Sequence, residues 1–342
     1  MPVTFNIKPT ELTHAQRLES QLNCVGLSTQ AFGLLGNVVR RMASVQRSTH
    51  IELQQLRHLV FCSDHGVFEN YAGEQSASGN SQLQVRKLLS GQAPLANMCT
   101  LHNIEMSIID CGLCCDEMTP RRLFTVNKIA HGCRDFSTVA AMTEAQLEAA
   151  VHLGVEQASL KLAEGARVLS FAAIGQGHTL SAAAITMALL KISAKEVIAN
   201  HNHHEPGIID DKINILTQAL QLHSDQLTDA WQIVRHLGGF ETATIMGAML
   251  VTAELGGTFL VDGFACSAAL LALHSLYPNI VDYAIFTHQS AYGGQQIIMK
   301  HLNQRPLLNL SLSSGEGSGS VLAWPLITSV VTSLQDSIAH SD

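Results

Sequence analysis

The chain alternates between short apolar runs and longer segments in which apolar residues recur every three or four positions. A short apolar run is typical of a buried strand, and the longer spacing is typical of a helix that packs on one face. The strands predicted in this way cover residues 58–62, 105–110, 166–172, 258–261 and 282–286. The predicted helices lie within 9–57 and cover 82–89, 144–163, 181–190, 241–255 and 265–273.

Small or polar turns join these strands to the helices that follow. A repeated strand, turn and helix predicts right-handed βαβ crossovers, and therefore an α/β fold with a mostly parallel, Rossmann-like sheet flanked by helices. Ligands bind beyond the carboxyl ends of the strands in such sheets. No linker or short repeat divides the chain, which predicts a single domain over 1–342. The turns expected together at that edge are 64–66, 175–179, 262–263, 288–290 and 315–319.

Composition narrows the class of protein. Of the 342 residues 46% are hydrophobic but only 5% are aromatic, a balance that suits close packing of helices on a sheet. The formal net charge of −8 argues against nucleic acid or an anionic membrane as the main partner. No uninterrupted apolar run reaches the ~20 residues of a membrane helix, and the N-terminus lacks a signal-peptide pattern. These features predict a cytoplasmic protein with free thiols.

The most informative motif is the glycine-rich run 315–319, which holds Glu316 between Gly315 and Gly317. Glycine tolerates positive φ and lets the backbone approach a ligand closely. The run follows the apolar stretch 307–312, so the carboxylate is expected on a turn at a strand end, where catalytic groups are often placed. The alternative is an ordinary turn with one solvated glutamate.

A second glycine turn, Gly175-Gln176-Gly177-His178-Thr179, joins a predicted strand to a helix. Its backbone N–H groups, the hydroxyls of Thr179 and Ser181 and the positive end of the helix dipole make a suitable cradle for phosphate. The turn is neither a Walker A loop nor the GxGxxG fingerprint, and tight strand-to-helix packing equally requires glycine. Lys212 could add a charge to the phosphate, or it could be a solvated lysine at a helix start.

Two clusters of metal-binding residue types have simpler explanations. The segment His201-Asn202-His203-His204-Glu205 lacks the i, i+4 spacing of a helical zinc site, and Pro206-Gly207 indicates a loop. The run Cys111-Gly112-Leu113-Cys114-Cys115 follows a predicted strand, and no second cysteine pair lies at zinc-site spacing. A polar loop and free thiols are favoured over a metal or redox site, and no cofactor or metal is predicted.

A set of short motifs follows in order along the chain. They are Asp64-His65-Gly66-Val67, Gly91-Gln92-Ala93-Pro94, the turn 175–181, Gly238-Gly239-Phe240-Glu241, Val261-Asp262-Gly263-Phe264, His288-Gln289-Ser290-Ala291 and Gly315-Glu316-Gly317-Ser318-Gly319. In this order and spacing the chain resembles the nicotinate-nucleotide:dimethylbenzimidazole phosphoribosyltransferases of cobalamin synthesis. The resemblance covers nearly the whole chain and rests on the ordered set, because each motif is weak alone.

The resemblance implies an enzyme that moves phosphoribose from nicotinate mononucleotide to a nitrogen of 5,6-dimethylbenzimidazole or a related base. The products would be α-ribazole 5′-phosphate and nicotinate, formed with inversion at the anomeric carbon and without a metal. The resemblance also implies a homodimer. In each subunit an α/β catalytic core, residues 58–324, would carry a small helical lobe from the chain ends, residues 1–57 and about 325–342.

By the same resemblance Glu316 is the general base that removes the acceptor's N–H proton. The pyridinium ring of the donor leaves without needing an acid, and a nearby anion would stabilise an oxocarbenium-like transition state. The residues assigned to the nucleotide, chiefly its phosphate, are Gly175, Gly177, Thr179, Ser181, Lys212 and Ser290. Gln82 is assigned to the acceptor pocket. The other residues expected in the substrate site are His178, Asp262, Gly263, Gly315 and Gly317.

Some positions depart from the family pattern. Ala173 and Tyr292 stand where the family has acids, and His178 stands where it has an asparagine. The pair Ser313-Ser314 replaces Arg-Leu, and the acceptor-loop pattern Ser-x-Tyr-Pro is absent near 73–76. The phosphate cradle and the base are retained while the pocket around the ring has changed. Two alternatives therefore stay open, an enzyme with a different acceptor and a non-catalytic homologue that binds a nucleotide or an azole.

Overall fold

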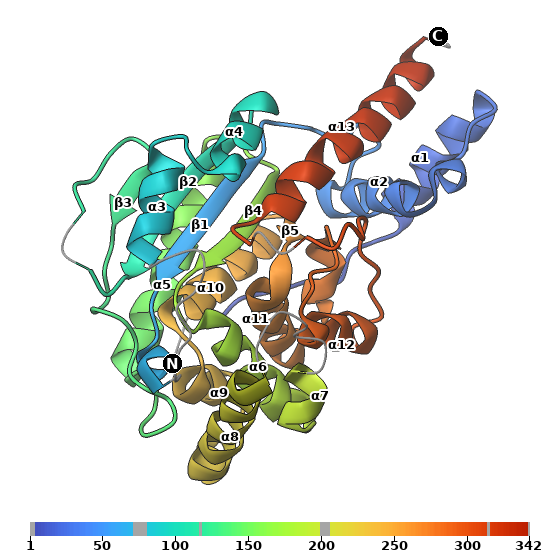
Figure 1. Ribbon diagram of the computed structural model, residues 1–342. Coiled ribbons are helices and arrows are strands. Elements are labelled where there is room, and N and C mark those ends of the chain that lie inside the picture. The colour runs from blue at the N-terminus through green and yellow to red at the C-terminus, as the bar shows by residue number, and fades with distance from the viewer. Residues whose placement is uncertain (1–3, 71–80, 116–117, 199–205, 313–314, 341–342) are drawn as a thin grey trace.

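The computed structural model describes residues 4–70, 81–115, 118–198, 206–312 and 315–340. Within them the chain forms one six-stranded sheet in which every strand pair is parallel. Figure 1 shows helices on both faces of this sheet. The predicted α/β fold class is confirmed.

The order of the strands places a ligand-binding edge near the middle of the sheet. The strands are β1 (Arg57–Ser63), β2 (Glu105–Gly112), β3 (Phe124–Val126), β4 (Val168–Ile174), β5 (Thr258–Val261) and β6 (Ala284–Phe286). Their order across the sheet is β3-β2-β1-β4-β5-β6, so it reverses between β1 and β4. The carboxyl ends at such a reversal flank the crevice where α/β sheets bind ligands. The short edge strand β3 was not predicted, because so brief an apolar run carries little periodic signal.

Helices account for most of the remaining described residues. They are α1 (Thr13–Cys24), α2 (Gly33–Gln46), α3 (Ser81–Leu89), α4 (Pro94–Leu101), α5 (Glu144–Ala163), α6 (His178–Leu190), α7 (Ala194–Ile198), α8 (Pro206–His223), α9 (Ala230–Leu237), α10 (Phe240–Glu254), α11 (Gly263–Leu276), α12 (Gly293–His301) and α13 (Ser318–Ala339). The bounds of α5 agree with the sequence because Thr143 and Gln146 form a reciprocal capping box. Helix α6 begins at His178 rather than at Ser181, since Gly177, with φ 87°, is its N-cap.

The two faces of the sheet carry separate hydrophobic clusters. Leu59 and Phe61 of β1 belong to one cluster, while the alternating residues Val60 and Cys62 belong to the other. The first cluster contains α10, whose residues are buried from its start to Ala253. Helices α5 and α10 cross so closely at glycines that a Cβ on residue 154 would lie 1.8 Å from a backbone oxygen of α10. The all-apolar runs of the sequence are therefore explained by burial on both sides.

The C-terminal helix α13 packs beside α1 and α2 (Figure 1). The three helices share the second cluster through Leu18, Met42 and Trp324. The division of the chain into a helical lobe and a catalytic core stays a prediction. Within the described residues no single helix is long and apolar enough to cross a membrane, although the bent pair Thr13–Cys24 and Thr29–Gln46 meets that test together on length and composition.

The segment before α13 corrects one expectation. Residues 307–312 were expected to form a strand that ends at the Glu316 turn, but they form only an isolated parallel bridge between Leu308 and His288. The N–H of Leu308 donates to the carbonyl of Thr287 at 2.9 Å, and the N–H of Gln289 donates to the carbonyl of Leu308 at 2.9 Å. Residues 307–312 therefore pair with the chain beyond β6 at this one bridge and do not form a strand of the sheet.

Candidate active site

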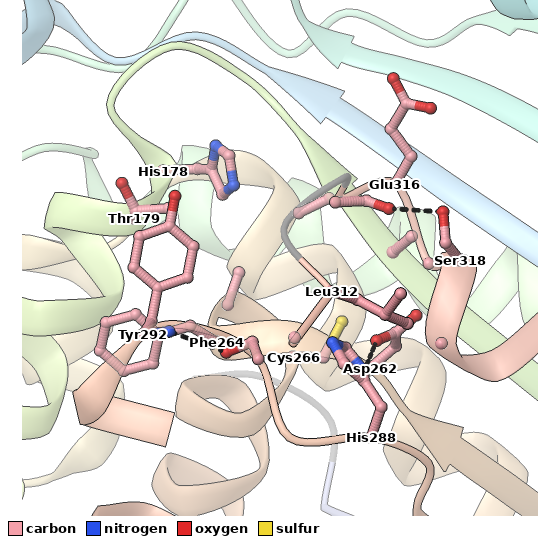
Figure 2. A pocket seen from close by; sticks show the side chains of 18 residues that line it. His178, Thr179, Asp262, Phe264, Cys266, His288, Tyr292, Leu312, Glu316 and Ser318 are labelled. Carbon is pink, nitrogen blue, oxygen red and sulfur yellow. Dashed lines mark hydrogen bonds and ion pairs between the residues drawn. The ribbon is translucent and has the colours of Figure 1, made fainter. Parts of the chain in front are cut away.

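A pocket opens beyond the carboxyl ends of β4 and β5 (Figure 2). It encloses about 560 Å³ of space, part of which is open to solvent. Its lining residues are 172–173, 178–179, 262–266, 288, 290, 292, 312 and 315–319. Four of the predicted turns, those at 175–179, 262–263, 288–290 and 315–319, therefore meet at one site. The fifth turn, at 64–66, does not line the pocket but contacts the turn at 175–179 through Asp64.

The glycine turn after β4 brings the N-terminus of α6 to the pocket. A Cβ on Gly175 would lie 1.7 Å from the carbonyl oxygen of Ser63, so only glycine fits this contact with β1. Gly177 has a positive φ of 87° and caps α6. His178 and Thr179, the first residues of the helix, line the pocket. The N–H groups of such a first turn have no acceptor within the helix and can bind an anion.

A buried carboxylate fixes the turn in place. Asp64, which follows β1, accepts hydrogen bonds from the N–H of Gln176 at 2.9 Å and from the N–H of Cys114 at 2.8 Å. It also accepts one from the hydroxyl of Ser81 at 2.5 Å. Asp64 thereby holds together the turn after β4, the loop after β2 and the start of α3.

Four helices begin at the pocket. Its lining includes the first residues of α6 and α11, the first residues of α13, and Tyr292, the N-cap of α12. Each helix N-terminus carries a partial positive charge. No lysine or arginine is among the described lining residues, so the helix N-termini supply the positive potential of the pocket. This arrangement suits a bound phosphate.

Glu316 lies on its glycine turn in the left-handed region, with φ 61°. Its carbonyl oxygen accepts a hydrogen bond from Nε2 of His58 at 3.0 Å. Burial raises the pKa of its carboxyl group, and the Lys87 ammonium of α3 partly opposes this shift. Figure 2 shows the carboxyl group pointing away from Asp262 and His288. A carboxyl group whose pKa is raised in this way is a better proton acceptor than an exposed one.

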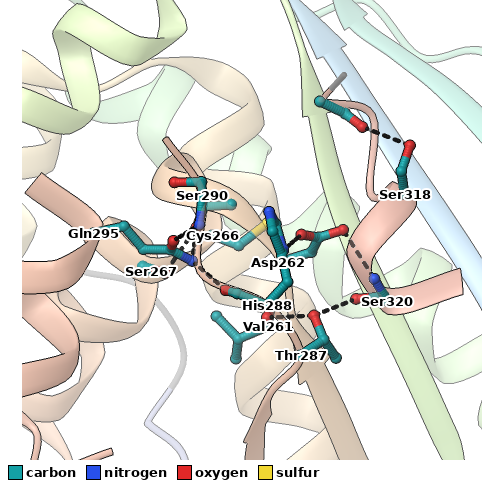
Figure 3. Close-up of polar contacts among 12 residues, drawn as sticks. Val261, Asp262, Cys266, Ser267, Thr287, His288, Ser290, Gln295, Ser318 and Ser320 are labelled. Atoms are coloured by element: carbon teal, nitrogen blue, oxygen red, sulfur yellow. Dashed lines mark hydrogen bonds and ion pairs between the residues drawn. The ribbon is translucent and has the colours of Figure 1, made fainter. Parts of the chain in front are cut away.

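Asp262 and His288 form an ion pair on the opposite wall (Figure 3). Although burial opposes the shift, the bond to Asp262 raises the pKa of His288. The second carboxylate oxygen accepts the N–H of Ser320 at 3.0 Å. The hydroxyl of Thr287 lies 3.2 Å from that of Ser320 and donates to the carbonyl of Val261 at 3.0 Å. The ends of β5 and β6 are thus fixed to the first turn of α13.

Gln295 of α12 supports the backbone around Ser290. Its side-chain oxygen accepts the N–H of Ser290 at 2.6 Å. Its side-chain nitrogen donates to the carbonyls of His288 at 3.2 Å and Gly263 at 3.3 Å. The turn that carries Ser290 is therefore fixed to the start of α11 (Figure 3).

A second ion pair lies beneath the turn after β4. Nε2 of His65 is 3.1 Å from a carboxylate oxygen of Glu241, and both side chains are fully buried. Burial opposes both charges, yet the contact raises the pKa of His65 and lowers that of Glu241. His65 and Glu241 appeared in the sequence only as members of two motifs, and no pairing between them was predicted. A charged residue inside the otherwise apolar helix α10 was the signal that could have identified the pair.

The pocket gathers eight of the predicted site residues. They are His178, Thr179, Asp262, Gly263, Ser290, Gly315, Glu316 and Gly317. Ser181 is buried instead, where its hydroxyl donates to the carbonyl of Leu237 at 2.8 Å and its N–H bonds within α6. Lys212 is buried in α8, and Gln82 is half-buried in α3. Neither lines the pocket, and the roles assigned to these residues stay predictions.

Some of the positions that depart from the family pattern also line the pocket. Ala173 and Tyr292 are both lining residues. The ring of Tyr292 stacks on that of Phe264, with centroids 6.2 Å apart and planes 23° apart (Figure 2). Within the described lining the carboxylates are Asp262 and Glu316. The wall near α12 is therefore aromatic where the family pattern has an acid.

Of the two clusters of metal-binding residue types, the structure describes only the cysteine cluster at 111–115. Within the described ranges, no three histidine, cysteine or carboxylate side chains gather as they would around a metal ion. Cys111, Cys114 and Cys115 form no disulfide with the other described cysteines. The segment 201–205, the pair 313–314 and the acceptor-loop positions 73–76 lie outside the described residues.

Comparison with known proteins gives the same family as the motifs. Residues 7–341 match the sequence profile of a phosphoribosyltransferase family. A nicotinate-nucleotide–dimethylbenzimidazole phosphoribosyltransferase of Photobacterium profundum is 34% identical over 95% of this chain and 94% of its own length. One from Bacteroides fragilis is 30% identical over 99% of this chain and 98% of its own.

A solved structure agrees. The crystal structure of CobT from Thermus thermophilus superposes with a TM-score of 0.85 at 28% identity, and covers 95% of this chain and 96% of that one. The resemblance drawn from the ordered motifs is thereby confirmed, and this chain belongs to the phosphoribosyltransferase family that includes these enzymes.

Proposed function

We propose that this protein transfers phosphoribose from nicotinate mononucleotide to a ring nitrogen of 5,6-dimethylbenzimidazole or a related base. The products are α-ribazole 5′-phosphate and nicotinate. The observation that carries the proposal is the placement of Glu316 in a pocket that four helix N-termini enter. One pocket thus offers an anion site and a half-buried proton acceptor, the two functions that this transfer requires.

The reaction needs little beyond these two functions. The bond between the anomeric carbon and the pyridinium nitrogen breaks, and its electron pair neutralises the departing ring, so no acid is needed. The lone pair of the acceptor nitrogen forms the new bond at the opposite face of the sugar. Glu316 accepts the proton from the acceptor's other nitrogen as the charge develops there. Its carboxylate also stabilises the oxocarbenium character of the transition state.

The surroundings of Glu316 support an acceptor site near α3. Lys87 of α3 is close enough to lower the pKa of Glu316, so this helix faces the base. Gln82, the predicted acceptor residue, belongs to the same helix. The donor phosphate is assigned to the first turn of α6 with Thr179 and to Ser290, which face the pocket from the other side.

The test is nicotinate release from nicotinate mononucleotide, followed by chromatography with and without 5,6-dimethylbenzimidazole. Release that depends on the acceptor, in equal amount to the ribazole phosphate formed, is the expected result. Absence of acceptor-dependent release with every azole and purine base tried would refute the transferase assignment.

A second candidate is an altered acceptor or a binding role without turnover. The observation that favours it is the pocket position of Ala173 and Tyr292, where the family pattern has acids. Nucleotide binding by calorimetry in the absence of turnover would support the binding role. Turnover with a purine or a phenol but not with the benzimidazole would support a different acceptor.

The proposal extends to the cellular location, the partners and the oligomeric state of the enzyme. We propose a cytoplasmic enzyme that acts on small molecules and binds neither nucleic acid nor membrane, and that forms the homodimer implied by the family resemblance. The net charge of −8 supports the exclusion of nucleic acid. Light scattering of the purified protein at several concentrations tests the dimer.

A further inference from the structure

We propose that His58 is a positioning residue, whose imidazole fixes the backbone of Glu316 and thereby aims the general base. This inference rests on the transferase function proposed above. His58 lies in β1, is fully buried, and is not among the residues that line the pocket. It acts on the reaction only through Glu316.

The hydrogen bonds of His58 determine its protonation. Nε2 lies 3.0 Å from the carbonyl oxygen of Glu316, and Nδ1 lies 3.0 Å from the hydroxyl of Ser170 on the neighbouring strand β4. A carbonyl oxygen can only accept, so Nε2 carries the hydrogen and donates it. Nδ1 then accepts from the hydroxyl of Ser170. The imidazole is neutral in this arrangement, and burial, which lowers its pKa, keeps it so.

The bond matters because the backbone of Glu316 is strained. A φ of 61° is unusual for a residue with a Cβ and persists where surrounding contacts enforce it. Within the described residues, His58 is the hydrogen-bond donor to this carbonyl. The imidazole also lies directly under the turn, since a Cβ on Gly317 would lie 2.1 Å from Cε1 of His58. The ring thus holds the peptide between Glu316 and Gly317, on the carboxyl side of the base.

Without this donor the Glu316 peptide can rotate and move the carboxylate from the proton that it must accept. The phosphate site at α6 and α12 does not depend on this bond. Loss of the hydrogen bond from His58 should therefore lower kcat and leave the KM for nicotinate mononucleotide nearly unchanged. A misplacement of about 1 Å in a catalytic group is expected to lower the rate by about 100-fold.

The experiment compares His58→Leu, His58→Gln and a matched control in the full chain. The glutamine amide can replace the Nε2 donor, so His58→Gln should keep kcat within roughly tenfold of the wild type while His58→Leu loses about 100-fold. The control is His223→Leu. It removes a buried histidine that bonds the carbonyl of Phe136 at 2.8 Å, away from the pocket, and should leave kcat unchanged. Equal kcat for His58→Leu and wild type would overturn the proposal.

A structural readout separates this inference from the proposed function. Nitrogen NMR of the wild type should show His58 as the neutral tautomer with hydrogen on Nε2. Hydrogen exchange of the amides at 315–319 should be at least about tenfold faster in His58→Leu, and near the wild-type rate in His58→Gln. An inactive wild type with this exchange pattern would refute the function and retain the positioning of Glu316. Unchanged exchange in His58→Leu would refute the positioning whatever the activity.

Discussion

The carboxylate of Asp64 accepts a 2.9 Å hydrogen bond from the backbone N–H of Gln176, which ties the end of β1 to the turn after β4. These strands are neighbours at the point where the strand order reverses. The same carboxylate accepts the hydroxyl of Ser81 at the start of α3. One buried group therefore joins the proposed phosphate side of the pocket to the helix that carries Gln82.

The contact between β1 and the turn after β4 leads to the first prediction. Gly175→Ala should lower the free energy of unfolding by about 1–3 kcal/mol and raise the KM for nicotinate mononucleotide. The reason is that its Cβ would lie 1.7 Å from the carbonyl oxygen of Ser63, a backbone atom that cannot move aside alone. Urea denaturation and steady-state kinetics measure the two effects.

The matched control is Gly207→Ala, because a Cβ at Gly207 meets nothing within 4 Å. That change should leave stability the same or raise it by less than about 1 kcal/mol. Equal stability of the two variants would contradict the close contact at Gly175.

Most of the fold could be predicted from the sequence, because periodicity, capping and short turns are local. The capping box at Thr143 and the run 258–261 gave their elements correctly. The error at 307–312 shows the limit of such reasoning. An apolar stretch becomes a strand only if a partner strand is available, and that depends on tertiary packing.

A site residue could be predicted where a short sequence motif itself contains the reactive group. Glu316 stands in a glycine turn that the sequence displays directly. His58 gave no such signal, because a histidine in a strand acquires its role only when Glu316 is placed against it. The burial of Ser181 was equally hidden, since helix phase decides whether its hydroxyl faces the pocket or the carbonyl of Leu237.

A second prediction concerns stability at Glu316. Burial raises the pKa of this carboxyl group, so its protonated form favours the folded state. That contribution is fully present below the unfolded pKa of about 4.3 and is lost as pH rises through the folded pKa. Glu316→Gln should therefore be more stable than the wild type at pH 8, and the difference should shrink towards pH 4.

Thermal unfolding at both pH values measures this difference. A wild type that is more stable than Glu316→Gln at pH 8 would show that the carboxylate is better solvated or better paired than its burial implies. Glu156→Gln, at an exposed position of α5 outside the pocket, is a control for the loss of one negative charge.

A third prediction concerns Lys87. Its ammonium lowers the pKa of Glu316, so Lys87→Gln should raise that pKa further. The base acts only when deprotonated, so the fall of kcat/KM towards acid pH should begin at a higher pH in the variant. Arg86→Gln removes an equal charge from the same helix and should leave the profile unchanged. Superimposable profiles for Lys87→Gln and wild type would contradict the contact.

A fourth prediction concerns the pair on the opposite wall. Asp262→Asn removes the charge that raises the pKa of His288, so that pKa should fall. In the wild type the stability contributed by this raised pKa is fully present below the unfolded value of about 6.5 and is lost as pH rises through the folded value. Proton NMR titration of the His288 ring, assigned with His288→Gln, measures the shift. An unchanged midpoint would contradict the ion pair.

The measurement that tests the central claim most directly is the anomeric configuration and yield of the product. Proton NMR of the reaction between nicotinate mononucleotide and 5,6-dimethylbenzimidazole should show the α-riboside forming at the rate of nicotinate release. Glu316→Gln should slow this by about 10²–10⁴-fold without weakening nucleotide binding. A β-configured product, or equal rates with and without Glu316, would contradict a single inverting transfer assisted by this base.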